Sequence, residues 1–389
     1  MNDSARFVSA RAQRVLLLVA LACAGLFLLG LWREPRRTWG GFLVGFSYFT
    51  GLALAGALFL SLATLAGARW FSALRRVPEA MASGLPVALL LGLALVFGVH
   101  ELYEWSHAAV VAEDPILAGK AGWLNEPAFI ARLVVYFALW IALARGMVRA
   151  SRRRDVSDDP AHGRALLRNA LLFLPVFAVT FSLASVDWIQ SLEPHWFSTI
   201  FALVTLAGAA TSGLAVGIGV TVLLRRRGGL RDAVGAAHLD DLGRLAIGFA
   251  LFWAYVWYCQ YMLIWYTDMP EETPYYALRM QGGWEVLTWA SLALNWAIPF
   301  FALMPRAARR NPTVLLRIAG VMLAGQAVHL FLLIAPPLMG TQPRIGVWEL
   351  APIVGALALF FWVLQRNLAA APVLPHGDPW LADSLRHDV

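Results

Sequence analysis

A short polar stretch, SVDWIQSLEPHW from Ser185 to Trp196, lies between two long apolar segments of this 389-residue chain. It carries two carboxylic acids and a histidine, which are the side chains that most often accept or donate protons in proteins. Trp188 would shield its neighbour from water, which favours the protonated form of a carboxyl group. The candidate proton acceptors are therefore Asp187, Glu193 and His195.

The elements that must position these residues are membrane helices. Hydrophobic residues make up 60% of the chain and charged residues 14%, with a mean hydropathy of +0.65. In soluble globular domains about a quarter of the residues are charged. The composition therefore predicts an all-α integral membrane protein. The first apolar run is long enough to span and is followed by no small-residue cleavage site, so we expect no cleaved signal peptide.

A bilayer core about 30 Å thick is crossed by roughly 20 helical residues. This length predicts one domain of ten transmembrane helices, residues 1–368, and a polar, Pro-containing cytoplasmic tail, residues 369–389. Pro86 in the third span and Pro175 in the fifth predict kinks. The predicted spans are Val15–Trp32, Phe42–Leu65, Met81–Val99, Ala128–Met147, Arg168–Val186, Ser198–Leu224, Leu245–Tyr266, Trp284–Met304, Val314–Ala335 and Val347–Leu368.

The charges fall unevenly on the two sides of these spans. When the spans are threaded alternately, 24 of the 31 Lys and Arg residues lie on the side that holds both termini. The other side holds seven basic residues against 13 acidic ones. Because positive charge is retained in the cytoplasm, both termini are expected to be cytoplasmic. The net charge of +7 therefore reflects a lipid bilayer as partner, and no nucleic acid is expected.

The sequence contains no recognisable motif for a redox centre within the chain itself. Cys23 and Cys259 both lie in apolar runs, which excludes a disulfide framework or a thiolate metal site. The sequence contains no CxxCH for covalent haem and no glycine-rich phosphate loop. We therefore expect no metal and no covalently bound cofactor in this chain.

Other titratable side chains are predicted on the same outer face as Asp187. Oxidation of a quinol at an outer-leaflet pocket would need a His or carboxylate for each hydroxyl proton and aromatic walls for the ring. The simpler alternative is an outer face that is acidic because positive charge stays inside, with an interfacial belt of Trp and Tyr. Arg132 is expected within reach of Glu113 and Asp114. The candidates for a quinone pocket or a proton path are His100, Glu101, Trp188, Glu271, Glu272 and His329.

His329 is the one histidine predicted deep within a span, with Gln326 one helical turn before it. An ionisable residue inside a membrane indicates function by default. His329 either lines a proton path, bonds to a neighbouring helix, or ligates haem. A haem would require a second histidine at matching depth, for which only His100 is conceivable.

Three segments of the chain together carry a family resemblance. They are FGVHELYEW, VDWIQSLEPHWFSTIF, and FWAYVWYCQYMLIWYTDMPEETPYYALR followed by QGGW. The chain resembles the NrfD-like family of ten-helix subunits related to the polysulfide-reductase membrane subunit. It is most similar to the second quinone-site-type membrane subunit of alternative complex III, a bacterial quinol:cytochrome c or quinol:acceptor oxidoreductase. The resemblance covers about Trp39 to Leu368.

The resemblance implies a fold, partners and a location. The fold would be two four-helix bundles, helices 2–5 and 6–9, flanked by helices 1 and 10, in the bacterial inner (cytoplasmic) membrane. The implied partners are an iron–sulfur subunit, multi-haem cytochrome c subunits and a paralogous NrfD-like membrane subunit. Haem and iron–sulfur clusters would belong only to these partners. Quinone or quinol is the implied ligand, with the paralogue the better candidate for its site and this chain serving proton transfer or assembly.

Two alternatives stay open at the level of sequence. The chain is either a purely structural or assembly subunit of such a complex, or a secondary transporter, since ten helices with internal Pro and Gly and a buried histidine also fit that class. A transporter would show paired broken helices at the midplane of two repeats. No convincing internal repeat is visible, and the charges crowd one edge of the predicted bundle.

Overall fold

The computed structural model describes residues 9–387. Ten helical segments in this range are long and apolar enough to cross a membrane, and the described residues contain no β-strand. The prediction of an all-α, multi-pass membrane protein with ten spans is therefore confirmed. The spans are α1 (Ala10–Arg33), α2 (Pro35–Leu65), α3 to α5 (Arg76–Leu102), α8 (Glu126–Arg153), α9 with η5 (Pro160–Leu192), α10 (Phe201–Arg226), α11 (Ala236–Thr267), α13 to α14 (Trp284–Leu303), α16 (Pro312–Ile334) and α18 (Val347–Ala369).

Short helices lie between these spans. Within the third and eighth spans the pieces are α3 (Arg76–Ala82), α4 (Leu85–Leu95), α5 (Val99–Leu102), α13 (Trp284–Leu292), the π-helical turn η6 (Ala293–Ala297) and α14 (Ile298–Leu303). The fifth span consists of α9 (Pro160–Trp188) and the turn η5 (Gln190–Leu192). In the connections the short helices are η2 (Arg69–Leu74), η4 (Glu104–Ser106), α6 (Ala108–Glu113), α7 (Pro115–Lys120), α12 (Pro274–Arg279), α15 (Arg306–Arg309), α17 (Pro336–Met339) and α19 (Leu381–Leu385).

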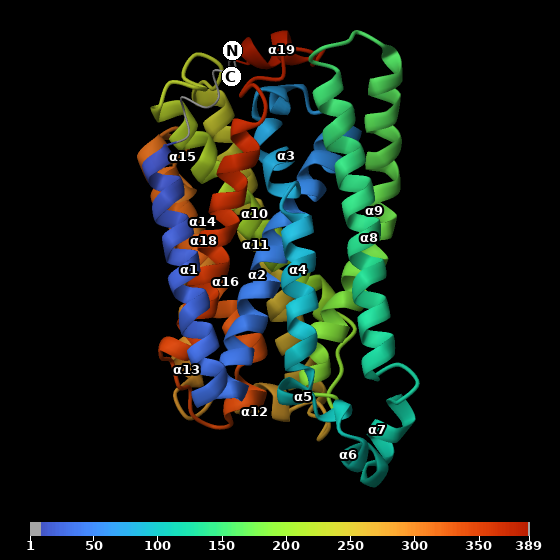
Figure 1. The fold of residues 1–389 in the computed structure, drawn as a ribbon. Helices are drawn as coiled ribbons and strands as arrows, with labels where there is room; N and C mark the ends of the chain where they lie inside the picture. The colour runs from blue at the N-terminus through green and yellow to red at the C-terminus, as the bar shows by residue number, and fades with distance from the viewer. Residues whose placement is uncertain (1–8, 388–389) are drawn as a thin grey trace.

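The connections gather at two ends of the molecule. We call the end with α5, α7 and α12 the acidic end, made of residues 34, 103–125, 193–200, 268–283 and 335–346. We call the opposite end the basic end, made of residues 66–75, 154–159, 227–235, 304–311 and 370–387. Figure 1 shows the start of α1 and α19 together at the basic end, at the top of the view. The first and last described helices therefore lie on the same side.

Several helices extend beyond their predicted ends. The fifth span begins at Pro160 rather than Arg168, because the Asp159 carboxylate accepts a hydrogen bond from the backbone N–H of Ala161 and caps the first turn. The fourth span begins at Glu126, where Asn125 accepts from a backbone N–H of the first turn. Hydropathy detects only the apolar part of such helices, so their capped polar turns are missed.

Two prolines are expected to kink their spans, and only one of them, Pro86, lies at a break in its helix. Pro86 lies in the first turn of α4, directly after the break between α3 and α4, where its missing N–H costs little. Pro175 lies inside α9, which stays helical on both sides of it. The eighth span carries an unpredicted π-helical turn, η6, directly before Pro299.

The second and sixth spans, α2 and α10, form the centre of the molecule. The most apolar windows of α2 and α10 are 89% and 72% buried, and the two helices pack on each other. α2 also packs against α3, α4, α9 and α18, and α10 against α11 and α16. The small residues of α2 suit this burial, because they let neighbouring helices approach closely. α1 is 11% buried and packs at the edge against α18 (Figure 1).

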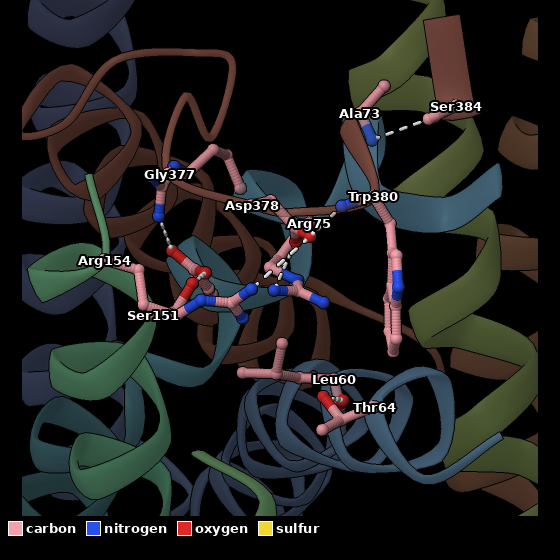
Figure 2. A network of polar contacts seen from close by, with 12 residues as sticks. Leu60, Thr64, Ala73, Arg75, Ser151, Arg154, Gly377, Asp378, Trp380 and Ser384 are labelled. Atoms are coloured by element: carbon pink, nitrogen blue, oxygen red, sulfur yellow. Dashed lines mark hydrogen bonds and ion pairs between the residues drawn. The ribbon is translucent and has the colours of Figure 1, made fainter. Parts of the chain in front are cut away.

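The residues after α18 pack back onto the basic end. The Asp378 carboxylate is buried and pairs with the Arg75 guanidinium. Ser384 in α19 donates its hydroxyl to the Trp70 carbonyl at 2.7 Å and accepts from the Ala73 N–H at 3.2 Å. Figure 2 shows the Arg75–Asp378 pair and the contact of Ser384 with Ala73, beside Leu60 and Thr64 at the end of α2. Buried polar contacts therefore hold the predicted tail against the helix ends.

Candidate functional site

Asp187 lies in the last turn of α9 and is 1% exposed. Arg132 donates to both of its oxygens, from Nε at 2.8 Å and from Nη2 at 2.9 Å. The Trp123 indole donates at 2.8 Å and the Tyr136 hydroxyl at 3.0 Å. A carboxylate offers about four acceptor positions, so these four donors satisfy it completely. Arg132 therefore pairs with Asp187, and the expected pairing with Glu113 or Asp114 is not formed.

Glu193 follows η5 and binds a different arginine. Arg279, at the end of α12, donates to its two oxygens at 2.7 and 3.3 Å. Arg279 is 4% exposed and also donates to the carbonyls of Leu332 and Leu333 at 3.0 and 3.3 Å. Those carbonyls belong to the last turn of α16, which has no further turn to bond them. Arg279 therefore joins the carboxylate of Glu193 to the end of α16.

The surroundings of Arg279 keep its guanidinium protonated. Its guanidinium carbon lies 3.5 Å from the centre of the Tyr275 ring, a cation–π contact. Burial lowers the pKa of Arg279, but Tyr275 and Glu193 outweigh that effect, and the net shift of the pKa is upward. Burial also raises the pKa of Tyr275 to about 12. Both groups therefore keep their protons at physiological pH.

His195 lies on the surface of the acidic end. Its Nε2 is 2.5 Å from a carboxylate oxygen of Asp114, and the two side chains are 49% and 25% exposed. Asp114 also caps α7 by accepting from two backbone N–H groups. The hydrogen bond from His195 is the largest cause that lowers the pKa of Asp114. The three proton-acceptor candidates therefore form three separate pairs, with Arg132, Arg279 and Asp114.

Four of the other candidates also lie outside the helix core. His100 is 61% exposed, with its Nε2 3.5 Å from Glu126, and Glu101 is exposed beside it. Glu271 is exposed and Glu272 half-buried at the acidic end. None of these four side chains lines the cavities described below. They surround the acidic end without converging on one pocket.

A cavity lies between α2, α9, α10 and α16, and we call it the central cavity. Its volume is about 40 Å³, enough for about three water molecules, since each needs roughly 10–15 Å³. Several buried polar atoms on its wall have no hydrogen-bond partner among residues 9–387. They are Ser47 Oγ, Thr50 Oγ1, Trp188 Nε1, Gln326 Nε2 and His329 Nε2. Unpaired polar groups are costly inside a membrane, so this wall fits a short chain of waters.

Gly208 of α10 makes room for the amide of Gln326 in this wall. A Cβ at position 208 would lie 2.7 Å from the Gln326 Oε1 atom and 3.7 Å from the His329 ring. A contact of 2.7 Å is too close for a carbon atom, so any larger residue would displace the amide. Trp188 closes another side of the cavity and packs edge-on against Phe46, at 4.9 Å between ring centres.

His329 separates the central cavity from a second, smaller cavity. The second cavity has a volume of about 20 Å³ and lies towards the acidic end, so we call it the outer cavity. Its wall includes Arg279, Tyr275, Thr288, Ser291 and Gln260, and His329 lines both cavities. The imidazole is 2% exposed and its ring meets the Trp253 ring edge-on at 5.0 Å. Because either ring nitrogen can hold a proton, this histidine can connect the two polar spaces.

Tyr48 closes the central cavity on the side of the basic end. Its hydroxyl donates to the Leu323 carbonyl at 2.7 Å. Leu323 in turn lines a largely aliphatic groove of about 220 Å³ between α10, α16 and α18, with Arg227 and Gln365 as its polar residues. The outer cavity, the central cavity and this groove therefore follow one another along the length of the molecule, separated by His329 and Tyr48.

The sizes of these cavities decide what chemistry they fit. Pockets that enclose a drug-sized ligand measure about 300–1,000 Å³, far above the central and outer cavities. The residues around His329 therefore fit water and protons, and do not fit a quinone ring in this arrangement. Within residues 9–387, no group of three or more His, Cys, Asp or Glu side chains is placed to hold a metal ion.

Sequence reasoning found some residues of this region and missed others. The sequence indicates His329 and Trp188 as candidates, with Gln326 one turn before His329, and all three line the central cavity. Tyr48 and Gly208 were missed, because a tyrosine and a glycine in apolar helices are typical of packing. Their one signal is position, since both lie in the small-residue helices that form the centre of the molecule.

No protein-family model matches this sequence, and no curated protein matches it.

Proposed function

We propose that the chain is a proton-transferring membrane subunit of a quinol:cytochrome c or quinol:acceptor oxidoreductase of the alternative complex III type. The observation that carries the proposal is His329, a buried histidine in the wall shared by two water-sized polar cavities. The motifs SLEPHW and WYTDMPEE resemble those of NrfD-like subunits and lie towards the acidic end, where Glu193 of the first motif binds Arg279 of the outer-cavity wall.

The helix neighbours support the two-bundle fold that belongs to this proposal. The second to fifth spans form a closed group, because α2 packs on α4 and α9, and α8 packs on both of these. The sixth to ninth spans form another, because α10 packs on α11 and α16, and α13 and α14 lie against these two helices. α1 and α18 flank the first group. We propose that these are the bundles of helices 2–5 and 6–9.

The proposed orientation follows the charges. The basic end would face the cytoplasm of a bacterium, and the acidic end would lie outside the inner membrane, where quinol protons are released. Electrons would pass through partner chains, namely an iron–sulfur subunit and multi-haem cytochrome c subunits, with a paralogous NrfD-like subunit as the candidate quinol site. The described chain itself offers proton carriers and no assigned electron carrier.

The chemistry of the proposed route is a relay of hydrogen bonds. A ring nitrogen of His329 accepts a proton from the outer cavity, and the other nitrogen releases one to water in the central cavity. Glu193 neutralises the Arg279 guanidinium on the same wall, so a second positive charge on His329 is less strongly opposed. The hydroxyls of Ser212 and Tyr48 extend the polar wall towards the basic end.

A purely structural role is the second candidate, and one observation favours it. Asp187 and Arg132 satisfy each other in a buried arrangement that leaves no acceptor position for a substrate. A transporter is less well supported. The break between α3 and α4 lies near the basic end, whereas η6 lies midway along its span, so the interruptions are not at matching positions of two repeats.

Isolation of the native complex tests the proposed function. The chain would be tagged in its own host and purified in mild detergent, with an untagged strain as control. We expect haem absorbance, iron–sulfur signals in electron paramagnetic resonance, and quinol:cytochrome c or quinol:acceptor turnover in the purified sample. A chain that purifies alone and transports a solute in liposomes would overturn the proposal in favour of a transporter.

A further inference from the structure

One face of α11 is covered by no other described helix. Its exposed side chains repeat at alternating spacings of four and three residues, and they are Leu251 at 41%, Tyr255 at 65%, Tyr258 at 56%, Met262 at 38% and Trp265 at 68%. Any outward face of a helix repeats at this spacing. The two tyrosines are therefore the informative feature, because they bring hydroxyl groups to a face turned away from the protein.

These tyrosines lie near the middle of the bilayer. Arg244, half exposed near the start of α11, and Trp265 near its end are the polar and aromatic residues that mark the membrane surfaces. They are separated by about 32 Å at 1.5 Å per helical residue, which matches a hydrocarbon core of about 30 Å. Tyr255 is then about 15 Å from either surface, and Tyr258 about 10 Å from the nearer one.

The hydroxyl groups have poor partners within the chain. Tyr258 makes no hydrogen bond to another residue of the described range, 9–387. The Tyr255 hydroxyl faces the Cys259 thiol, and sulfur is a weak acceptor. At this depth no water is available, and an unpaired hydroxyl in hydrocarbon is costly. A second molecule with hydrogen-bonding groups at the same depth would remove that cost.

The outward faces of α8 and α9 do not share this feature. The exposed residues in the middle of α8 and α9 are aliphatic, for example Val135 at 52%, Leu171 at 54% and Val179 at 60%. Aliphatic side chains suit contact with lipid tails, which are equally apolar. The face of α11 therefore differs from the aliphatic outward faces of α8 and α9.

The loop that follows α11 indicates what kind of molecule covers this face. Asp268 and Glu271 are exposed there, and neither makes an ion pair with another residue in the described range. Two copies of this chain packed symmetrically through α11 would bring these carboxylates together, and like charges across an interface disfavour association. A different chain with Lys or Arg at the same level would be attracted instead.

We propose that this face of α11 binds a transmembrane helix of a different membrane protein. That helix presents a hydrogen-bonding group at mid-membrane depth, opposite Tyr255 and Tyr258, and carries Lys or Arg next to Asp268 and Glu271. The inference goes beyond proton transfer and does not depend on it, because the α11 face and the cavities are formed by different side chains.

Photo-crosslinking in native membranes tests the interface. A benzophenone amino acid replaces Tyr258 in one variant and Val179, at similar depth on the outward face of α9, in the control. We expect a protein adduct from position 258 and only lipid adducts from position 179. The adduct peptide must come from a membrane span of another chain, with a basic residue at the end near Glu271. Lipid adducts alone at position 258, or a peptide of this same chain, would overturn the proposal.

Removing the hydroxyls tests their part in the contact. In Tyr255→Phe/Tyr258→Phe the aromatic surface is kept, and we expect the cross-linked partner to co-purify about threefold less per lost hydrogen bond, the average for such bonds in membranes. Tyr266→Phe makes the same change at the membrane surface, where water replaces the lost bond, and should leave co-purification unchanged. Equal yields from the double variant, from Tyr266→Phe and from the unmodified chain would contradict the hydrogen-bonding role, whatever the outcome for proton transfer.

Discussion

Two arginine–carboxylate pairs lie at the acidic end, and they differ in what surrounds them. Asp187 is 1% exposed and accepts four hydrogen bonds, all from α8 and the loop before it. Glu193 has a side chain that is 20% exposed, and its arginine also caps α16 and lines the outer cavity with His329. The first pair is closed on itself, whereas the second is connected to the polar interior.

Asp187 and Glu193 look alike in the sequence, but their different surroundings predict different roles. The Asp187 pair joins the fourth and fifth spans, and its removal should damage folding. The Arg279 pair faces the cavity that ends at His329, and changes along that wall should affect proton movement. The variants below separate these two tasks.

The largest expected effect is on folding, from Asp187→Ala. It leaves the guanidinium of Arg132 and the donors of Trp123 and Tyr136 without their acceptor, and breaking a buried pair costs about 3–5 kcal/mol. We expect a lower thermal midpoint and less assembled complex, with unchanged turnover per assembled complex. Asp187→Asn, which keeps one acceptor oxygen, should lose less. Normal assembly with reduced turnover would show that Asp187 belongs to the chemistry.

Gly208→Ala should have the next largest effect, and it acts on the central cavity. The new Cβ would lie 2.7 Å from Gln326 Oε1, and such overpacking costs about 1–3 kcal/mol. Turnover should fall with stability, because the amide is pushed away from His329. Gly217→Ala on the same helix meets no atom within 4 Å and is the matched control. Equal behaviour of the two variants would contradict a functional cavity.

Tyr48→Phe tests the barrier between the central cavity and the groove. It removes the hydrogen bond to the Leu323 carbonyl, a loss of about 1 kcal/mol. We expect a small drop in the thermal midpoint and faster passive proton leakage across liposomes that contain the complex. Leakage identical to that of the unmodified chain would place the barrier elsewhere.

The smallest effect is expected from the exposed His195–Asp114 pair. His195→Ala should leave turnover unchanged, because both side chains lie on the surface and line no cavity. The pKa of Asp114 is lowered in the folded chain, chiefly by the hydrogen bond from His195. The pair therefore contributes above the unfolded pKa of about 3.9 and loses its contribution as pH falls through the lower folded value. A pH titration of stability for the unmodified chain and His195→Ala checks this, and a stability difference that persists undiminished in strong acid would contradict it.

The sequence predicted the spans well and the pairings poorly. All ten spans follow from runs of apolar residues, because a bilayer imposes one length on every helix. Asp187 and Glu193 stand out as acids beside apolar helices, but their partners depend on which helices become neighbours. Arg132 was predicted near Glu113 and Asp114, which are closer in sequence, and pairs with Asp187 through the contact of α8 and α9.

The buried route was only partly visible in the sequence. His329 and Gln326 share one helix face at a spacing of three residues, so their proximity is a local property. Tyr48 joins the wall through a contact with Leu323, and Arg279, in the connection before the eighth span, caps the end of α16. Both contacts join residues far apart in the chain, and helix periodicity carries no information about them.

The most direct test of the account measures turnover in assembled complexes that carry His329→Gln. Glutamine keeps hydrogen-bonding groups in the cavity wall but takes up no proton, and loss of an acid–base group typically costs a hundredfold or more. We therefore expect quinol oxidation per haem, and protons moved per electron in liposomes, to fall by about tenfold or more at unchanged assembly. Unchanged turnover and proton movement in His329→Gln would contradict the proposed route.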